Sequence, residues 1–101
     1  MGAAVFGDVY HYRFAEGLPL QEVEDSLMLA AMAAEGLHGR TRLRLEARFE
    51  LLPRDRSCRI EASTAVGHDL ARIFTGLLSQ QFGEEGFSVE KSVGYADAQS
   101  L

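Results

Sequence analysis

The sequence predicts an α+β protein with a ferredoxin-like βαββαβ arrangement, a two-layer sandwich in which two helices cover one face of a four-stranded antiparallel sheet. Two observations predict this class: a strand-turn-strand pattern in the middle of the chain, and a helical pattern on each side of it, accompanied by a short alternating segment. Right-handed crossovers then favour the strand order 4-1-3-2. The chain of 101 residues has the length of a single domain, with an expected core over 8–93 and a flexible tail over 94–101.

The central hairpin is predicted over residues 40–66, and it organises the rest of the sheet. Apolar and polar side chains alternate over 40–51, which is the period of a strand with one buried face. Residues 53–57 carry turn chemistry, and the alternation resumes at Cys58. One register satisfies the apolar and the charged face together. It pairs Leu51 with Cys58, Phe49 with Ile60, Ala47 with Ala62 and Leu45 with Thr64 on the apolar face, and Glu50 with Arg59 and Arg48 with Glu61 on the charged face.

The first and last strands are predicted over 8–15 and 87–93. In the first strand, alternation gives one aromatic face and one basic face, which are Tyr10, Tyr12 and Phe14, and His11 and Arg13. We expect the aromatic face to pack into the core, because the opposite orientation would bury a histidine and an arginine. A base-stacking platform is the alternative interpretation of an aromatic stripe, but it requires the stripe to lie on the open face among basic neighbours.

The two helices are predicted over 19–35 and 69–82. Gly36 suits the position just after the first helix, where a left-handed backbone conformation is common. Asp69 is the expected N-cap of the second helix, because its carboxylate can accept a hydrogen bond from the first turn. Gly83 is the expected end of that helix.

Composition and charge disfavour several classes of function. The net charge of −5 disfavours general affinity for nucleic acid or for an anionic membrane, because phosphate binding requires a local excess of cations. No apolar run approaches the ~20 residues of a membrane span, and the N-terminus does not resemble a signal peptide. Cys58 is the single cysteine and lies on the predicted core face, which is typical of a reducing compartment. We therefore expect a cytoplasmic protein.

The sequence predicts no catalytic residue, no metal site and no cofactor, so an enzyme is the less favoured interpretation. The histidines His11, His38 and His68 are scattered, and none has the spacing to a second histidine or to a cysteine that a metal motif requires. The sequence also lacks a glycine-rich phosphate loop and a nucleophile elbow.

The best candidate for a ligand site is the start of the second helix, formed by Gly67, His68 and Asp69, with Arg72 one turn later. Backbone donors at a helix N-terminus, a histidine and an arginine can together hold a carboxylate or a phosphate. Asp69 competes for the same donors as a cap, so the structural interpretation of this segment is favoured over the ligand site.

The first helix carries a candidate interface. Residues 27–34 include no polar side chain, so a single sheet cannot cover all of them. Three interpretations remain for Met28, Leu29 and Met32: contact with the second helix, contact with another subunit, or the lining of a ligand pocket.

The open face of the predicted sheet is the second candidate interface. His11 and Arg13 lie there among further charged side chains, which form either a solvated face with ion pairs or a partner surface. Arg40, Arg42 and Arg44 have no opposing carboxylate in the predicted register. We interpret them as protection of an edge strand against aggregation, in preference to an anion site.

Two hypotheses for the function follow. The first is a non-catalytic module that associates with itself, with a dimer favoured, or with a protein partner. The second is a regulatory domain that binds an amino acid or an anion, either at the loop before the first helix or at the N-terminus of the second helix.

Overall fold

The computed structural model of this chain describes residues 6–95, which form three α-helices and four strands. In chain order, these elements are β1 (Phe6–Phe14), α1 (Leu20–His38), α2 (Arg40–Glu46), β2 (Arg48–Leu52), β3 (Ser57–Glu61), α3 (Ala65–Phe82) and β4 (Phe87–Tyr95), with a short 3-10 helix (Pro53–Asp55) between β2 and β3. The predicted flexible tail begins within β4, and its residues 96–101 lie outside the described part of the chain.

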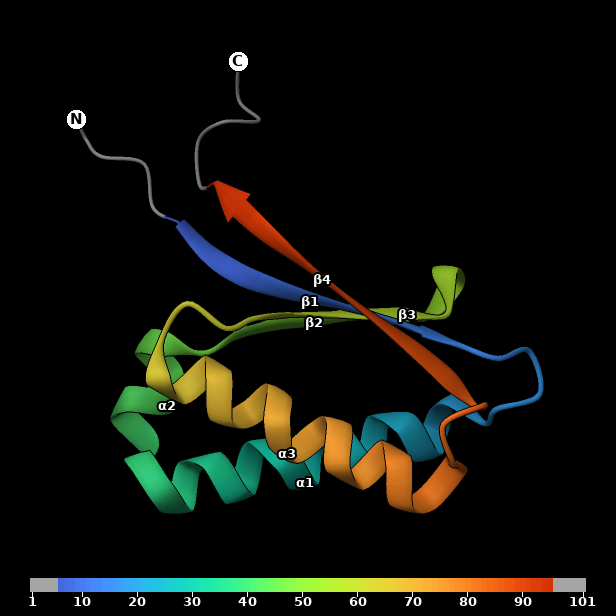
Figure 1. Ribbon diagram of the computed structural model, residues 1–101. Coiled ribbons are helices and arrows are strands. Elements are labelled where there is room, and N and C mark those ends of the chain that lie inside the picture. The colour runs from blue at the N-terminus through green and yellow to red at the C-terminus, as the bar shows by residue number, and fades with distance from the viewer. Residues whose placement is uncertain (1–5, 96–101) are drawn as a thin grey trace.

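The four strands form one antiparallel sheet in the order β2-β3-β1-β4, which reads β4-β1-β3-β2 from the opposite edge. Figure 1 shows α1 and α3 side by side on one face of this sheet. The α+β class and the four-stranded antiparallel sheet are therefore confirmed. The expected element order is not, because a third helix, α2, precedes β2. None of the helices within residues 6–95 is both long enough and apolar enough to cross a bilayer.

The core lies between the sheet and the two long helices, and Tyr12 is at its centre. The ring of Tyr12 is completely buried and meets the ring of Phe74 edge to face, with 5.0 Å between the centroids. Its hydroxyl group is 2.8 Å from Thr75 Oγ1 and donates to the carbonyl oxygen of Ala71 at 3.3 Å. The aromatic face of β1 thus points inward, as predicted, and Tyr12 joins β1 to α3 by packing and by hydrogen bonds.

The predicted register of the hairpin is confirmed over the length of β2. Leu51 lies opposite Cys58 and Phe49 opposite Ile60, while Glu50 faces Arg59 and Arg48 faces Glu61 on the other side of the sheet. Cys58 and Ile60 are fully buried, as the apolar face requires.

The predicted strand over 40–47 is wrong, because residues 40–46 form α2. Arginine, leucine and glutamate are good helix formers, and a helix brings Arg42 within 3.1 Å of Glu46 one turn later. The interpretation of the arginines as edge protection is wrong for the same reason, since Arg40 bonds Glu35 and lies in a helix. The expected pairs of Ala47 with Ala62 and of Leu45 with Thr64 do not form, because β3 ends at Glu61.

The C-terminal end of the first predicted helix and the N-terminal start of the second differ from the structure. α1 continues past Gly36 to His38, and its C-cap is Gly39, whose φ of 93° suits glycine. α3 begins four residues before Asp69, with Thr64 as its N-cap. Thr64 Oγ1 accepts a hydrogen bond from the backbone N–H of Gly67 at 2.9 Å. Asp69 is therefore free of the capping role, while Gly83 ends the helix as predicted.

We expect opposite effects from alanine at two glycines of α3. A Cβ atom at the buried Gly67 would overlap the carbonyl oxygen of Glu61, so Gly67→Ala should lower the free energy of unfolding by ~1–3 kcal/mol. The exposed Gly76 has no heavy atom near a Cβ position, so Gly76→Ala should raise it by ~0.5–1 kcal/mol. Urea denaturation measures both changes, and equal effects of the two substitutions would contradict the packing described for Gly67.

Candidate functional site

The predicted ligand residues lie together at the start of α3, and the structure adds His38 to them. His38 is the last residue of α1, and its Nε2 donates to Asp69 Oδ2 at 2.8 Å. His68 Nδ1 is 3.8 Å from the other carboxylate oxygen of Asp69. The His38 side chain is mostly buried, whereas His68 is half exposed.

Electrostatics at this cluster favour an ionised Asp69. The hydrogen bond from His38 lowers the pKa of the Asp69 carboxyl group below its ordinary value of 3.8, and the charges of His38, His68 and Arg72 act in the same direction. The opposing contribution, loss of hydration, is smaller than the His38 hydrogen bond. The carboxylate thus links the end of α1 to the start of α3.

The first turn of α3 has little capacity for an anion. The N–H of Gly67 already bonds Thr64 Oγ1, and the N–H of His68 bonds the carbonyl oxygen of Thr64. The carbonyl oxygen of Glu61 lies against Gly67, and it presents partial negative charge to the same space. Within residues 6–95, no three side chains of the His, Cys, Asp or Glu type gather in a metal-binding arrangement. The cluster is best explained as a structural link.

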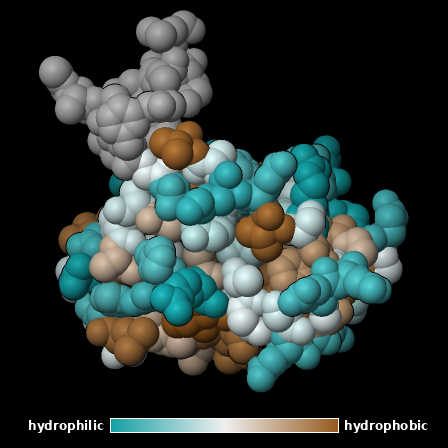
Figure 2. All heavy atoms as spheres, viewed as in Figure 1, coloured by the Kyte–Doolittle hydropathy of each residue, from teal (hydrophilic) through white to brown (hydrophobic). Residues whose placement is uncertain are grey.

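The outer side of α1 is apolar and exposed. Met28 and Leu29 are each 55% exposed and Met32 is 63% exposed. Figure 2 shows hydrophobic residues along the lower edge of the molecule, where α1 runs in Figure 1. The second helix thus leaves more than half of each of these three side chains exposed. We call this set (Met28, Leu29 and Met32) the α1 patch.

The α1 patch extends to the flank of α1 that faces away from α3. Ser26 marks the opposite flank, because its Oγ donates to Gln81 Oε1 of α3 at 2.6 Å. At 100° per residue, Met28 lies about 200° and Met32 about 240° around the helix from Ser26. Two methionines thus point away from the neighbouring helix.

The open face of the sheet is charged, as predicted. His11 and Arg13 are exposed on β1, and His11 lies between Arg59 of β3 and Glu90 of β4. Arg59 is 3.6 Å from Glu61 on the same strand and 4.0 Å from Glu50 of β2, so this face carries ion pairs both within a strand and between neighbouring strands.

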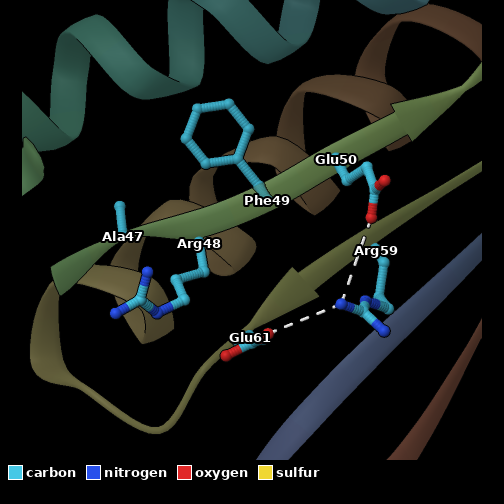
Figure 3. Close-up of a pocket in the computed structure, with 6 residues that line it drawn as sticks. All are labelled: Ala47, Arg48, Phe49, Glu50, Arg59 and Glu61. Atoms are coloured by element: carbon cyan, nitrogen blue, oxygen red, sulfur yellow. Dashed lines mark ion pairs between the residues drawn. The ribbon is translucent and has the colours of Figure 1, made fainter.

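An open groove of about 450 Å³ lies over β2 and its neighbour β3, next to one edge of the sheet. It is lined by Ala47, Arg48, Phe49, Glu50, Arg59 and Glu61. Figure 3 shows the charged side chains on one side of the strand pair, and Phe49 on the other side, directed towards α1. Phe49 remains 37% exposed, although its register partner Ile60 is fully buried. We call this feature the β2 groove.

Sequence reasoning missed the β2 groove and the contact between His38 and Asp69. The groove depends on the short length of β2, which the extended strand over 40–51 concealed. His38 and Asp69 are 31 residues apart, and nothing local in the sequence indicates that α1 would end beside α3. No protein-family model matches this chain, and a comparison with curated proteins finds no significant match.

The link between His38 and Asp69 should make the free energy of unfolding depend on pH in the acidic range. Because the folded state lowers the pKa of Asp69, the stabilisation is present above pH 3.8 and is lost as the pH falls through the lowered value. Asp69→Asn should therefore be less stable than the unmodified protein near neutral pH, and the difference should vanish in acid. Thermal melts across this range test the expectation. His68→Gln keeps the His38 contact and should retain the dependence.

Cys58 should be chemically silent in the folded protein. Burial raises the pKa of its thiol to about 12, so almost no thiolate is present at neutral pH. A thiol reagent should label Cys58 only as fast as the protein unfolds, and immediately in denaturant. Rapid and complete labelling of the native protein would contradict the burial of Cys58.

Proposed function

We propose that this protein acts by association, as a homodimer or with a protein partner, and not by catalysing a reaction. The observation that carries this proposal is the α1 patch. Three large apolar side chains share one exposed surface of α1. Binding a partner there removes apolar surface from water, which is favourable, and breaks few existing contacts. Two of them are methionines, whose unbranched side chains adapt to an opposing surface.

A second copy of the chain is the favoured partner. Closed dimers with two-fold symmetry are the commonest assemblies of soluble proteins, and a surface on one copy then meets the same surface on the other. The net charge of −5 supports a protein partner over nucleic acid. The buried, unpaired Cys58 supports a reducing compartment, and we propose a cytoplasmic location on that ground.

We further propose that the fold is a ferredoxin-like plait in which α2 is an insertion between α1 and β2. The strand order and the position of α1 and α3 on one face support this assignment. Folds of this kind carry many unrelated functions, so the assignment adds nothing to the functional argument.

The alternative function is a small-ligand regulatory domain, and the geometry gives it less support. The loop before α1 is held by Arg56, whose guanidinium donates to the carbonyl oxygens of Ala15 and Leu18. The donors in the first turn of α3 are also largely engaged. A thermal-shift screen with amino acids, nucleotides and phosphorylated metabolites distinguishes the two functions. A saturable rise in melting temperature would favour the ligand, and a flat response favours association.

Placing charges in the α1 patch should weaken association. Met28→Glu combined with Met32→Glu should raise the dissociation constant of the dimer by roughly 100-fold, because apolar burial is lost and carboxylates would have to leave water. Sedimentation velocity measures this change. Gln80→Glu, on the exposed surface of α3, is the matched control and should have no effect. A protein that is monomeric at high concentration and recovers no partner in a pull-down would contradict the proposal.

A further inference from the structure

Within residues 6–95, β2 is an edge strand with unpaired backbone groups on its free side. The backbone N–H of Ala62 donates to the carbonyl oxygen of Asp8. In the register of β1 and β3, the even-numbered residues of β3 therefore form backbone hydrogen bonds with the even-numbered residues of β1. In an antiparallel ladder the bonding direction alternates along a strand, so the odd-numbered residues of β3 bond to the even-numbered residues of β2. The N–H and C=O groups of Phe49 and Leu51 therefore point towards the free edge, where another strand can pair with them.

The side chains of β2 are complementary to a second copy of β2. A two-fold axis through Phe49 sets Phe49 opposite Phe49, and it sets Arg48 of each copy opposite Glu50 of the other. Arg48 has no ion-pair partner elsewhere in residues 6–95, and Glu50 contacts Arg59 only at 4.0 Å. Each opposed pair would thus give Arg48 a carboxylate that its own chain does not supply.

Neighbouring registers of this pairing are unfavourable. An axis through Arg48 or through Glu50 would set two like charges directly opposite each other. An axis between two residues would set charged side chains against apolar ones, because the two faces of the sheet would be exchanged. At the opposite edge of the sheet, an axis through the middle of β4 would set Lys91 against Lys91, and Lys91 already contacts Asp8 at 3.6 Å.

We propose that a second copy of this chain binds at the free edge of β2, beside the β2 groove, with β2 paired antiparallel to β2 about a two-fold axis at Phe49. This inference rests on the proposed self-association and specifies its geometry. The sheets of the two copies then join into one sheet of eight strands, with the helices of both copies on the same face.

The α1 patch belongs to the same interface in this arrangement. α3 lies over β1, where Tyr12 bonds it, and α1 lies on the β2 side, above Phe49 in Figure 3. The flank of α1 with Met28 and Met32 faces away from α3, and therefore towards the axis. Neighbouring strands lie ~4.8 Å apart, and the α1 helix of each copy lies on the β2 side of its sheet. The axes of the two α1 helices therefore approach the 8–10 Å separation typical of packed helices. A five-residue strand pairing buries too little surface for a stable dimer, and the helices supply the remainder.

Two charge reversals test the register. Arg48→Glu creates two pairs of opposed glutamates in its own dimer, and Glu50→Arg creates two pairs of opposed arginines. Each variant alone should dimerise about tenfold more weakly than the unmodified chain. In an equimolar mixture, every cross-copy pair again has opposite charges, so a heterodimer should form with near-original affinity. Sedimentation velocity measures the affinities, and native mass spectrometry identifies the mixed dimer.

The controls separate this pairing from changes in the fold. Each reversal also alters the hairpin, because Arg48 faces Glu61 and Glu50 faces Arg59. Reversing all four charges together restores opposite charges both within the hairpin and across the axis, so this variant should dimerise like the unmodified chain. Arg13→Glu, on the open face of β1, should leave dimerisation unchanged.

The outcomes distinguish the two proposals. A dimer that is unaffected by either single reversal, or a mixture that associates no better than its components, overturns the β2 pairing and leaves self-association standing. If the charge reversals have no effect but Met28→Glu combined with Met32→Glu weakens the dimer, the interface lies on α1 alone. An unmodified chain that is monomeric at every concentration overturns both the dimer and the pairing.

Discussion

The start of α3 is the constraint on which the other elements depend. Thr64 accepts a hydrogen bond from Gly67, and the missing side chain of Gly67 lets the first turn of the helix close against the carbonyl oxygen of Glu61. β3 therefore ends at Glu61, and no strand remains to pair with the residues before Arg48. Those residues form α2 instead. Thr64 Oγ1 donates a hydrogen bond to the carbonyl oxygen of Glu46, the last residue of α2, at 3.0 Å. A short β2 and an incompletely covered Phe49 are consequences of one helix cap.

The predictable parts of the fold are those in which two independent patterns agree. The hairpin register was predictable because the apolar pairs and the charged pairs select the same alignment. The inward aromatic face of β1 was predictable because the alternative would bury Arg13. The extent of the hairpin was not. Alternating arginine and leucine satisfy a strand, but they are also good helix formers, and a distant residue, Thr64, determines where β3 ends.

The candidate surfaces divide in the same way. The absence of polar residues over 27–34 indicated that one sheet could not cover Met28 and Met32, but the sequence left open whether the second helix, another subunit or a ligand would cover them. The link between His38 and Asp69 requires the end of α1 to lie beside α3, which is a property of the packed structure. The role of Asp69 was misassigned because Thr64 and Asp69 are both suitable N-caps, and only the close contact at Gly67 selects the earlier one.

The charges at the two sheet edges favour a closed dimer over an open-ended assembly. Strand pairing is hazardous when both edges of a sheet are free, because each added copy exposes another edge. Here β2 carries charges that complement a second β2. The middle of β4 carries Lys91, and a two-fold axis there would set this lysine opposite the Lys91 of the second copy, so that the two charges repel. Since a two-fold pairing uses the same edge of both copies, it consumes both β2 edges at once and leaves only β4 edges outside. The pairing that the charges favour is thus also the one that stops at two chains.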